Sequence, residues 1–113
     1  PWWLDRMDRE TDLLGAHTPY MKRHPHQYME DGQCFVSCLP EEAAIEATIA
    51  QIGDVGIVFA SDYPHWDCGF PETVERIEKR NLSETVRRHI FETNALSLHT
   101  RFSSIVESVR YAS

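Results

Sequence analysis

A short apolar run followed at once by polar and aromatic side chains constrains the fold of this chain most. Residues 57–60 read Ile-Val-Phe-Ala, and residues 61–67 read Ser-Asp-Tyr-Pro-His-Trp-Asp. A continuous apolar run of this length is typical of a strand that is covered on both faces. Pro64 has no backbone donor, so the strand must end before it. Since sites in α/β proteins lie at the carboxyl ends of parallel strands, residues 61–67 are the predicted site.

A second strand and a helix precede this run. Residues 33–39 contain Cys, Phe, Val and Cys, and Pro40 ends that strand. Three isoleucines then stripe one helical face up to Ile52, and Gly53 is a natural stop for the helix. We therefore predict parallel, adjacent strands at residues 34–39 and 57–61, joined by a helix over residues 41–52.

The remaining segments are predicted to be helical. The recurrence of Trp3, Met7 and Leu14 predicts a helix that stops at Gly15. A short helix is expected at residues 25–30, and further helices are expected to start at Pro71 and at the capping residue Ser83. The whole chain reads as a single partial domain, whose parts are a helix with a His-rich linker (1–31), a βαβ core with the site loop (32–98) and a C-terminal amphipathic helix (99–113).

Charge and cysteine content exclude several classes of partner. The net charge is −7, and residues 32–69 hold six acids without any Lys or Arg. Such a chain lacks the basic surface that nucleic acids need, and no apolar run is long enough to span a bilayer. The acidic block suits a cation, or it is simply a solvated helix face. The three cysteines lack zinc-site spacing, which favours small buried hydrophobes in a reducing, cytoplasmic setting.

The site segment also carries a family resemblance. Residues 61–67, the following Phe-Pro at 70–71 and the later Thr93-Asn94-Ala95 resemble the amidohydrolase-2 group. These metal-dependent hydrolases and decarboxylases are related to aminocarboxymuconate semialdehyde decarboxylase. The resemblance covers roughly residues 33–98 and, more loosely, the start of the chain. It implies an α/β fold that is a C-terminal fragment of a TIM (β/α)8 barrel, holding the last two parallel strands with their flanking helices.

The resemblance also implies roles for individual residues. Asp62 would be a metal ligand or would act on the metal-bound water as a catalytic carboxylate. His65 would assist it, while Trp66 and Trp3 would line the substrate pocket and Asp67 its mouth. The metal would be divalent, with zinc expected in a full-length protein. One carboxylate cannot hold a catalytic zinc, so this chain alone is expected to bind none.

Structural roles for the same residues remain open. Asp62 could cap the loop through backbone N–H groups, His65 could fill a turn, and Trp3 could belong to helix packing. His24 and His26 flank a proline that starts a helix, so we assign them to a surface linker rather than to a metal pair.

Two classes of function follow from the sequence. The first is a metal-dependent enzyme that hydrolyses or non-oxidatively decarboxylates a small organic acid, with this chain as a fragment that lacks most metal ligands. The second is a non-catalytic fragment or interaction module. A small-molecule substrate is the expected partner, homo-oligomerisation remains open, and neither nucleic acid nor membrane is expected.

Overall fold

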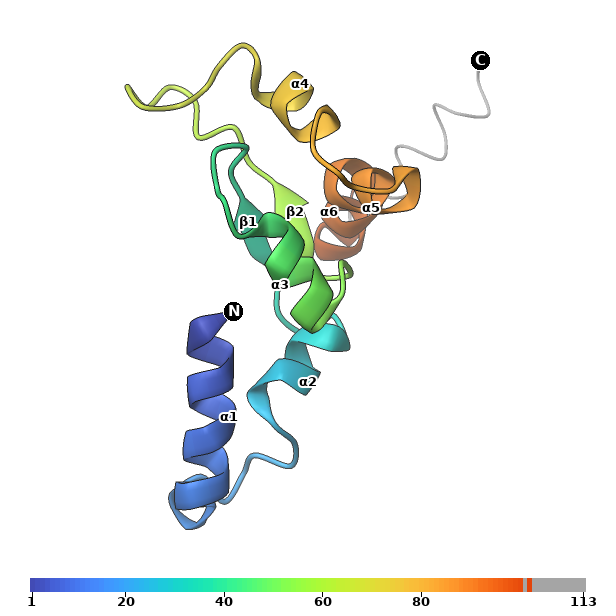
Figure 1. The fold of residues 1–113 in the computed structure, drawn as a ribbon. Coiled ribbons are helices and arrows are strands. Elements are labelled where there is room, and N and C mark those ends of the chain that lie inside the picture. The colour runs from blue at the N-terminus through green and yellow to red at the C-terminus, as the bar shows by residue number, and fades with distance from the viewer. Residues whose placement is uncertain (101, 103–113) are drawn as a thin grey trace.

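The computed structural model describes residues 1–100 and 102. It contains both helices and strands, in the order α1, η1, α2, β1, α3, β2, α4, α5, η2 and α6 (Figure 1). The molecule is elongated, with extents of 54 × 33 × 27 Å. Within the described residues, no helix combines the length and the apolar character needed to cross a membrane.

The two strands form the predicted parallel pair. Strand β1 is Val36–Cys38 and strand β2 is Ile57–Phe59, in the register Val36↔Ile57 and Cys38↔Phe59. Helix α3, Ile45–Ile52, connects them, so the βαβ prediction is confirmed. The helix ends at Gly53, whose φ of 72° lies in the left-handed region that glycine tolerates best.

All three elements are shorter than predicted. The helix begins at Ile45 rather than at residue 41 because Glu42 serves a turn instead. Its carboxylate accepts a hydrogen bond from the Leu39 N–H at 2.9 Å, and its own N–H donates to the Leu39 carbonyl at 3.1 Å. Glu42, which lies within the predicted helix, therefore fixes the end of β1 instead.

A small apolar core joins the sheet to the helices after it. Ile77 of α4 (Thr73–Glu78) is 0% exposed, and Ile90 of the π-helical segment η2 (His89–Thr93) is 1% exposed. They pack with the sheet and α3 residues of the same cluster, Cys38, Ile45 and Ile57. Burying these side chains is what holds α4 and η2 against the βαβ unit.

The cysteines differ from one another in burial. Cys38 is buried in the core, and burial raises the pKa of its thiol to about 11, so it stays protonated at neutral pH. Cys68 is half-buried and Cys34 is exposed. The expectation of a buried Cys34 is wrong because β1 begins two residues later than predicted, which leaves Cys34 in the preceding turn.

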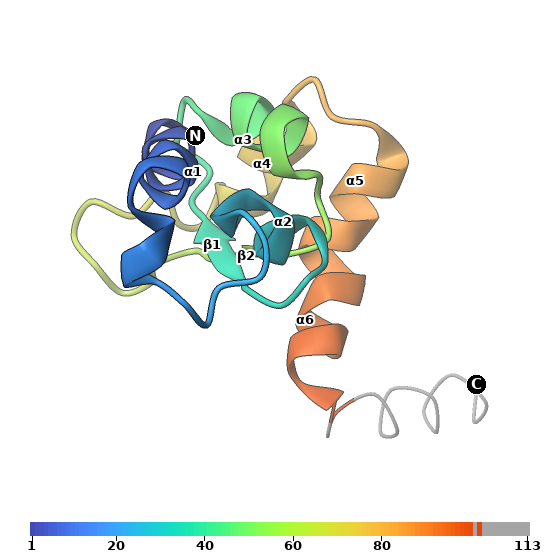
Figure 2. The same ribbon diagram turned by 90° about the horizontal axis from the view of Figure 1, so that it is seen from below.

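Helices α5 (Glu84–Arg88), η2 and α6 (Asn94–Leu98) follow one another in a single column beside β2 (Figure 2). The Ser83 hydroxyl accepts a hydrogen bond from the Val86 N–H at 3.2 Å, which confirms the predicted cap. The buried amide of Asn94 donates to the carbonyls of Asp54 and Ile57, at 2.5 and 2.7 Å. One side chain thus ties this column to the start of β2.

The first helix packs against the rest by polar contacts. Helix α1, Trp2–Leu14, has no buried residue, and its Asp8 carboxylate lies 2.6 Å from His26 Nδ1 of α2 (Pro25–Glu30). Helix α2 has the predicted bounds. The predicted stop at Gly15 is confirmed, since α1 ends at Leu14, although Gly15 has a right-handed φ of −53° and starts a 3₁₀ turn, η1 (Gly15–His17). Most of the predicted helix at 99–113 lies outside the described residues.

A free strand edge leads to a stability prediction. Within the described residues the sheet has two strands only, and Val36 of β1 is 38% exposed. An unpaired edge with apolar neighbours favours association between chains. We expect the 113-residue chain, expressed alone, to aggregate or to fold poorly. Size-exclusion chromatography and thermal denaturation measure this, and a monomer that melts sharply and reversibly would contradict it.

Candidate functional site

The candidate site lies on a loop that leaves the carboxyl end of β2. The Ala60 N–H donates to the Cys38 carbonyl at 3.1 Å, and this bond continues the contact between the two strands just past β2. We define residues 61–70 as the site loop, which runs from there toward α4 (Figure 1). Because β1 and β2 are parallel, their carboxyl ends meet at the same edge of the sheet, where sites of α/β proteins lie.

Asp62 has an unusual backbone conformation within this loop. Its φ is 56°, and it is the one described residue other than glycine with a positive φ. Asp tolerates this left-handed region better than most residues, although at some cost in conformational energy. Such conformations cluster at functional sites, where the surroundings hold them in place. We therefore take Asp62 as the residue around which the site is built.

His65 holds Asp62 through two contacts. The His65 N–H donates to the Asp62 carbonyl at 2.9 Å, and His65 Nδ1 lies 2.8 Å from Asp62 Oδ2. A carboxylate only accepts, so Nδ1 is the donor in this contact, and Nε2 is the ring nitrogen that remains for another partner. The turn orients the carboxylate, and it leaves an imidazole nitrogen able to accept a proton or to bind a cation.

Asp67 extends this pair to a group of three donors. Single ligand atoms from Asp62, His65 and Asp67 all lie within 4.8 Å of one another. Carboxylate oxygen and imidazole nitrogen are ligands that zinc accepts. The donor set therefore fits a divalent cation, although all three residues are exposed. Sequence reasoning placed Asp67 only at the mouth, whereas its position five residues after Asp62 in one loop could have suggested a shared role.

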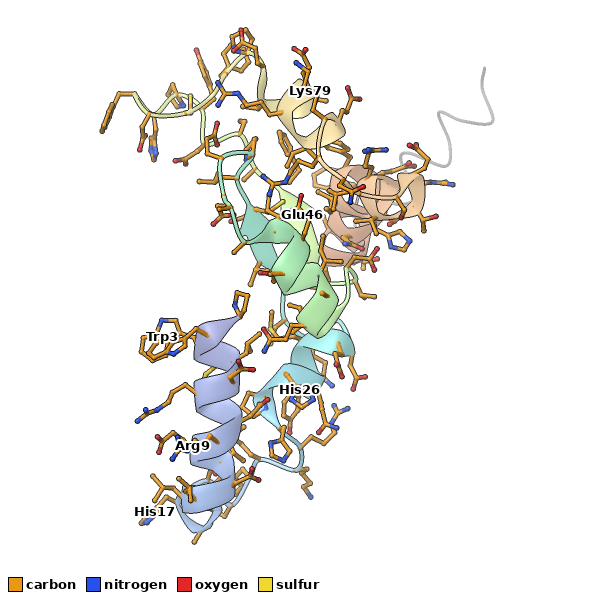
Figure 3. The ribbon with its side chains drawn as sticks, in the orientation of Figure 1. Trp3, Arg9, His17, His26, Glu46 and Lys79 are labelled. Carbon is orange, nitrogen blue, oxygen red and sulfur yellow. The ribbon has the colours of Figure 1, made fainter. Side chains whose placement is uncertain are left out.

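The two predicted aromatic residues lie in different parts of the molecule. Trp66 is 94% exposed on the site loop. Trp3 packs edge-on against Trp2, with ring centroids 4.8 Å apart, and lies near the α1–α2 end of the molecule together with His26 (Figure 3). Trp3 lines an open hollow of about 400 Å³ together with side chains of α1 and the following linker, among them Met7 and Met21.

The structure therefore does not bring Trp3 to the predicted site. The lining of its hollow includes neither Asp62, His65 nor Trp66. The reason is the way α1 packs, because its contacts go to α2 through Asp8 and to α3 through Asp5, which accepts from the Gln51 amide at 2.6 Å.

The acidic block at residues 32–69 is largely paired within the protein. Glu41 lies 2.9 Å from Arg76, Glu46 lies 2.5 Å from Arg80, and Asp54 lies 2.8 Å from His89. The hydrogen bond from Arg80 is the main reason why the pKa of Glu46 is lowered. Glu42 accepts the hydrogen bond from the Leu39 N–H described above. The two remaining acids of this block are Asp62 and Asp67, and both lie on the site loop.

A parallel βαβ unit with a carboxylate–imidazole pair at the carboxyl end of a strand defines an α/β protein with its candidate site at that end. Comparison with protein families is more specific, since the Amidohydrolase family model matches residues 5–99. The chain therefore belongs to the amidohydrolase family, whose members are generally hydrolases that depend on a divalent metal. No curated protein matches the sequence.

Proposed function

We propose that the chain is the C-terminal part of a metal-dependent amidohydrolase that hydrolyses or non-oxidatively decarboxylates a small organic acid. The proposal places it near the group related to aminocarboxymuconate semialdehyde decarboxylase. One observation carries it: Asp62 is held in a left-handed conformation at the carboxyl end of β2 by His65. The family membership supplies the reaction class.

A TIM barrel accounts for the rest of the proposed site. Such a barrel has eight parallel strands and its active site at their carboxyl ends. We assign β1 and β2 to the last two strands, which is supported by their parallel pairing and by the polar loop after β2. The other strands would supply further metal ligands and would cover the free edge of β1.

The residues of this chain would contribute binding and proton transfer. A bound divalent metal, zinc by preference for this donor set, supplies an activated water. Asp62 is the expected ligand or the acceptor of that water's proton, and the Nδ1–H of His65 keeps the carboxylate in position. His65 Nε2 can transfer a proton to or from the substrate. Trp66, on the same loop, is proposed to line the substrate pocket, whereas Trp3 lines the separate hollow on α1.

A non-catalytic interaction module is the second candidate. It is favoured by the exposure of all three donor residues, because metal and substrate sites usually lie in a concave setting. In the first proposal the barrel supplies that concavity; in the second, none exists. Self-association through the free β1 edge fits this second candidate, because in the barrel other strands would cover that edge.

Metal removal tests the proposed function. The intact protein that contains this chain would be assayed with a panel of small carboxylic acids for release of carbon dioxide, and with amides and lactones for hydrolysis. We expect one of these activities to disappear after chelation and to return when stoichiometric zinc is added. Activity that survives complete metal removal would contradict the proposal. A metal-loaded protein inactive on the whole panel would favour the interaction module.

A further inference from the structure

The site loop is tied near one end to the last residue of β1 and near the other end, through α4, to the connection between β1 and α3. The loop begins just after Ala60, whose N–H donates to the Cys38 carbonyl at 3.1 Å. Its second end leads into α4, and Arg76 of that helix lies 2.9 Å from Glu41 of the connection. A loop of about ten residues with both ends tied in this way has few conformations open to it.

The Glu41–Arg76 ion pair lies directly over Gly69. A Cβ added to Gly69 would overlap Glu41 Oε1 and would lie 2.8 Å from Arg76 Nη1. Gly69 is not one of the described glycines with a positive φ, so its backbone conformation does not require a glycine here. What requires it is space, because the carboxylate and the guanidinium meet where a side chain would otherwise stand.

A series of turns connects Gly69 with the site. The Glu72 N–H donates to the Gly69 carbonyl at 3.0 Å, and the Cys68 N–H donates to the His65 carbonyl at 3.2 Å. The next turn is the one in which the His65 N–H donates to the Asp62 carbonyl. Two consecutive turns, 62–65 and 65–68, thus link Asp62 to the residue before Gly69, and the 69–72 turn leads on to α4, so the position of Gly69 constrains the position of the carboxylate.

A second ion pair, between α3 and the residue two positions after the end of α4, has a different role. Arg80 donates to both carboxylate oxygens of Glu46, at 2.9 and 2.5 Å, and to the Pro40 carbonyl at 3.1 Å. Its side chain is 18% exposed, whereas that of Arg76 is 48% exposed. The less exposed Arg80 pair therefore fixes the chain just after α4 to α3, whereas the Arg76 pair lies over Gly69 of the loop.

From this geometry we propose that Glu41 and Arg76 are positioning residues. Their ion pair lies over Gly69, holds the site loop in place and so fixes the Asp62–His65 pair. The catalytic consequence rests on the proposed function, whereas the effect on the loop does not. An exposed ion pair contributes little to global stability. Its loss is expected to change the loop and the turnover rate while the fold stays intact.

Limited proteolysis of the intact protein measures the loop directly. Chymotrypsin cleaves after Trp66, which is 94% exposed, whereas Tyr63 and Phe70 are each followed by proline and resist cleavage. We expect Glu41→Gln, Arg76→Gln and Gly69→Ala to raise the rate of cleavage after Trp66 about two- to fivefold, the range that corresponds to an exposed ion pair. The reciprocal exchange, Glu41→Arg with Arg76→Glu, should restore the original rate.

The matched control is Lys79→Gln at the C-terminal cap of α4 (Figure 3). Lys79 pairs with Glu75 at 2.6 Å, one turn away on α4, and its side chain is 72% exposed. This change should leave both cleavage and turnover unaltered. Cleavage rates for the three loop variants equal to that of Lys79→Gln would overturn the proposal.

Turnover gives the second readout. In an active enzyme, the three loop variants should lower kcat about two- to fivefold at unchanged metal content, in parallel with the change in cleavage. An unchanged kcat in variants with faster cleavage would overturn the positioning role. If the parent protein shows no turnover at all, the proposed function fails, and the cleavage rates still decide whether the pair holds the loop.

Discussion

Replacing Asp62 by Asn in the intact protein is expected to lower kcat/KM by roughly 10²–10⁴-fold, the range typical of a lost acid–base group. Asn has nearly the same size and tolerates a positive φ, so the turn around residue 62 should survive. What disappears is the negative charge that faces His65 Nδ1 at 2.8 Å and that would bind a metal or accept a proton. The midpoint of thermal unfolding should hardly change, since the Asp62 side chain is 41% exposed.

A second Asp–His pair provides the control for this prediction. Asp12 lies 3.4 Å from His24 at the far end of α1 and is 68% exposed, so Asp12→Asn removes a similar charge away from the site. Steady-state kinetics and metal content would be compared for the two variants. If Asp62→Asn behaved like Asp12→Asn, Asp62 would have only the structural role of closing its turn.

The βαβ unit could be predicted because its signals are local. The run at residues 57–60 and the stop at Gly53 each depend on a few neighbouring residues, and both lie where expected. The helix start was mispredicted because the acid expected in the helix, Glu42, bonds to the Leu39 N–H instead. Hydrophobic periodicity does not indicate whether a polar side chain will compete with the helix for backbone groups.

The candidate site was predictable only in part, for a similar reason. Asp62 and His65 are three residues apart, so a turn brings them together as their spacing suggests. The ion pair of Glu41 with Arg76 joins residues 35 positions apart, and its contact with Gly69 depends on how α4 packs. The position of Trp3 likewise depends on packing, since nothing in its own segment indicates which elements α1 touches.

The second large effect is a loss of stability, which we expect when the buried side chain of Asn94 is replaced. This side chain is 5% exposed, and its amide donates to the carbonyls of Asp54 and Ile57. Asn94→Ala would leave both acceptors without this donor in a place that water reaches poorly. We expect the free energy of unfolding to fall by about 1–3 kcal/mol, the usual cost of a buried polar group left unpaired, since the Asp54 carbonyl keeps the Ile57 N–H as a donor at 3.4 Å.

Urea denaturation of the intact protein measures this change, with Ser97→Ala as the matched control. Ser97 lies on the same helix, and its hydroxyl donates only to the Thr93 carbonyl one turn earlier, at 2.9 Å, in an exposed position. Its removal should change stability by no more than about 0.5 kcal/mol, as is usual at the surface. A clear difference between the two variants would show that the link from α6 to β2 stabilises the fold. Equal effects would mean that apolar contacts such as those of Ile90 hold the helix column in place without the amide.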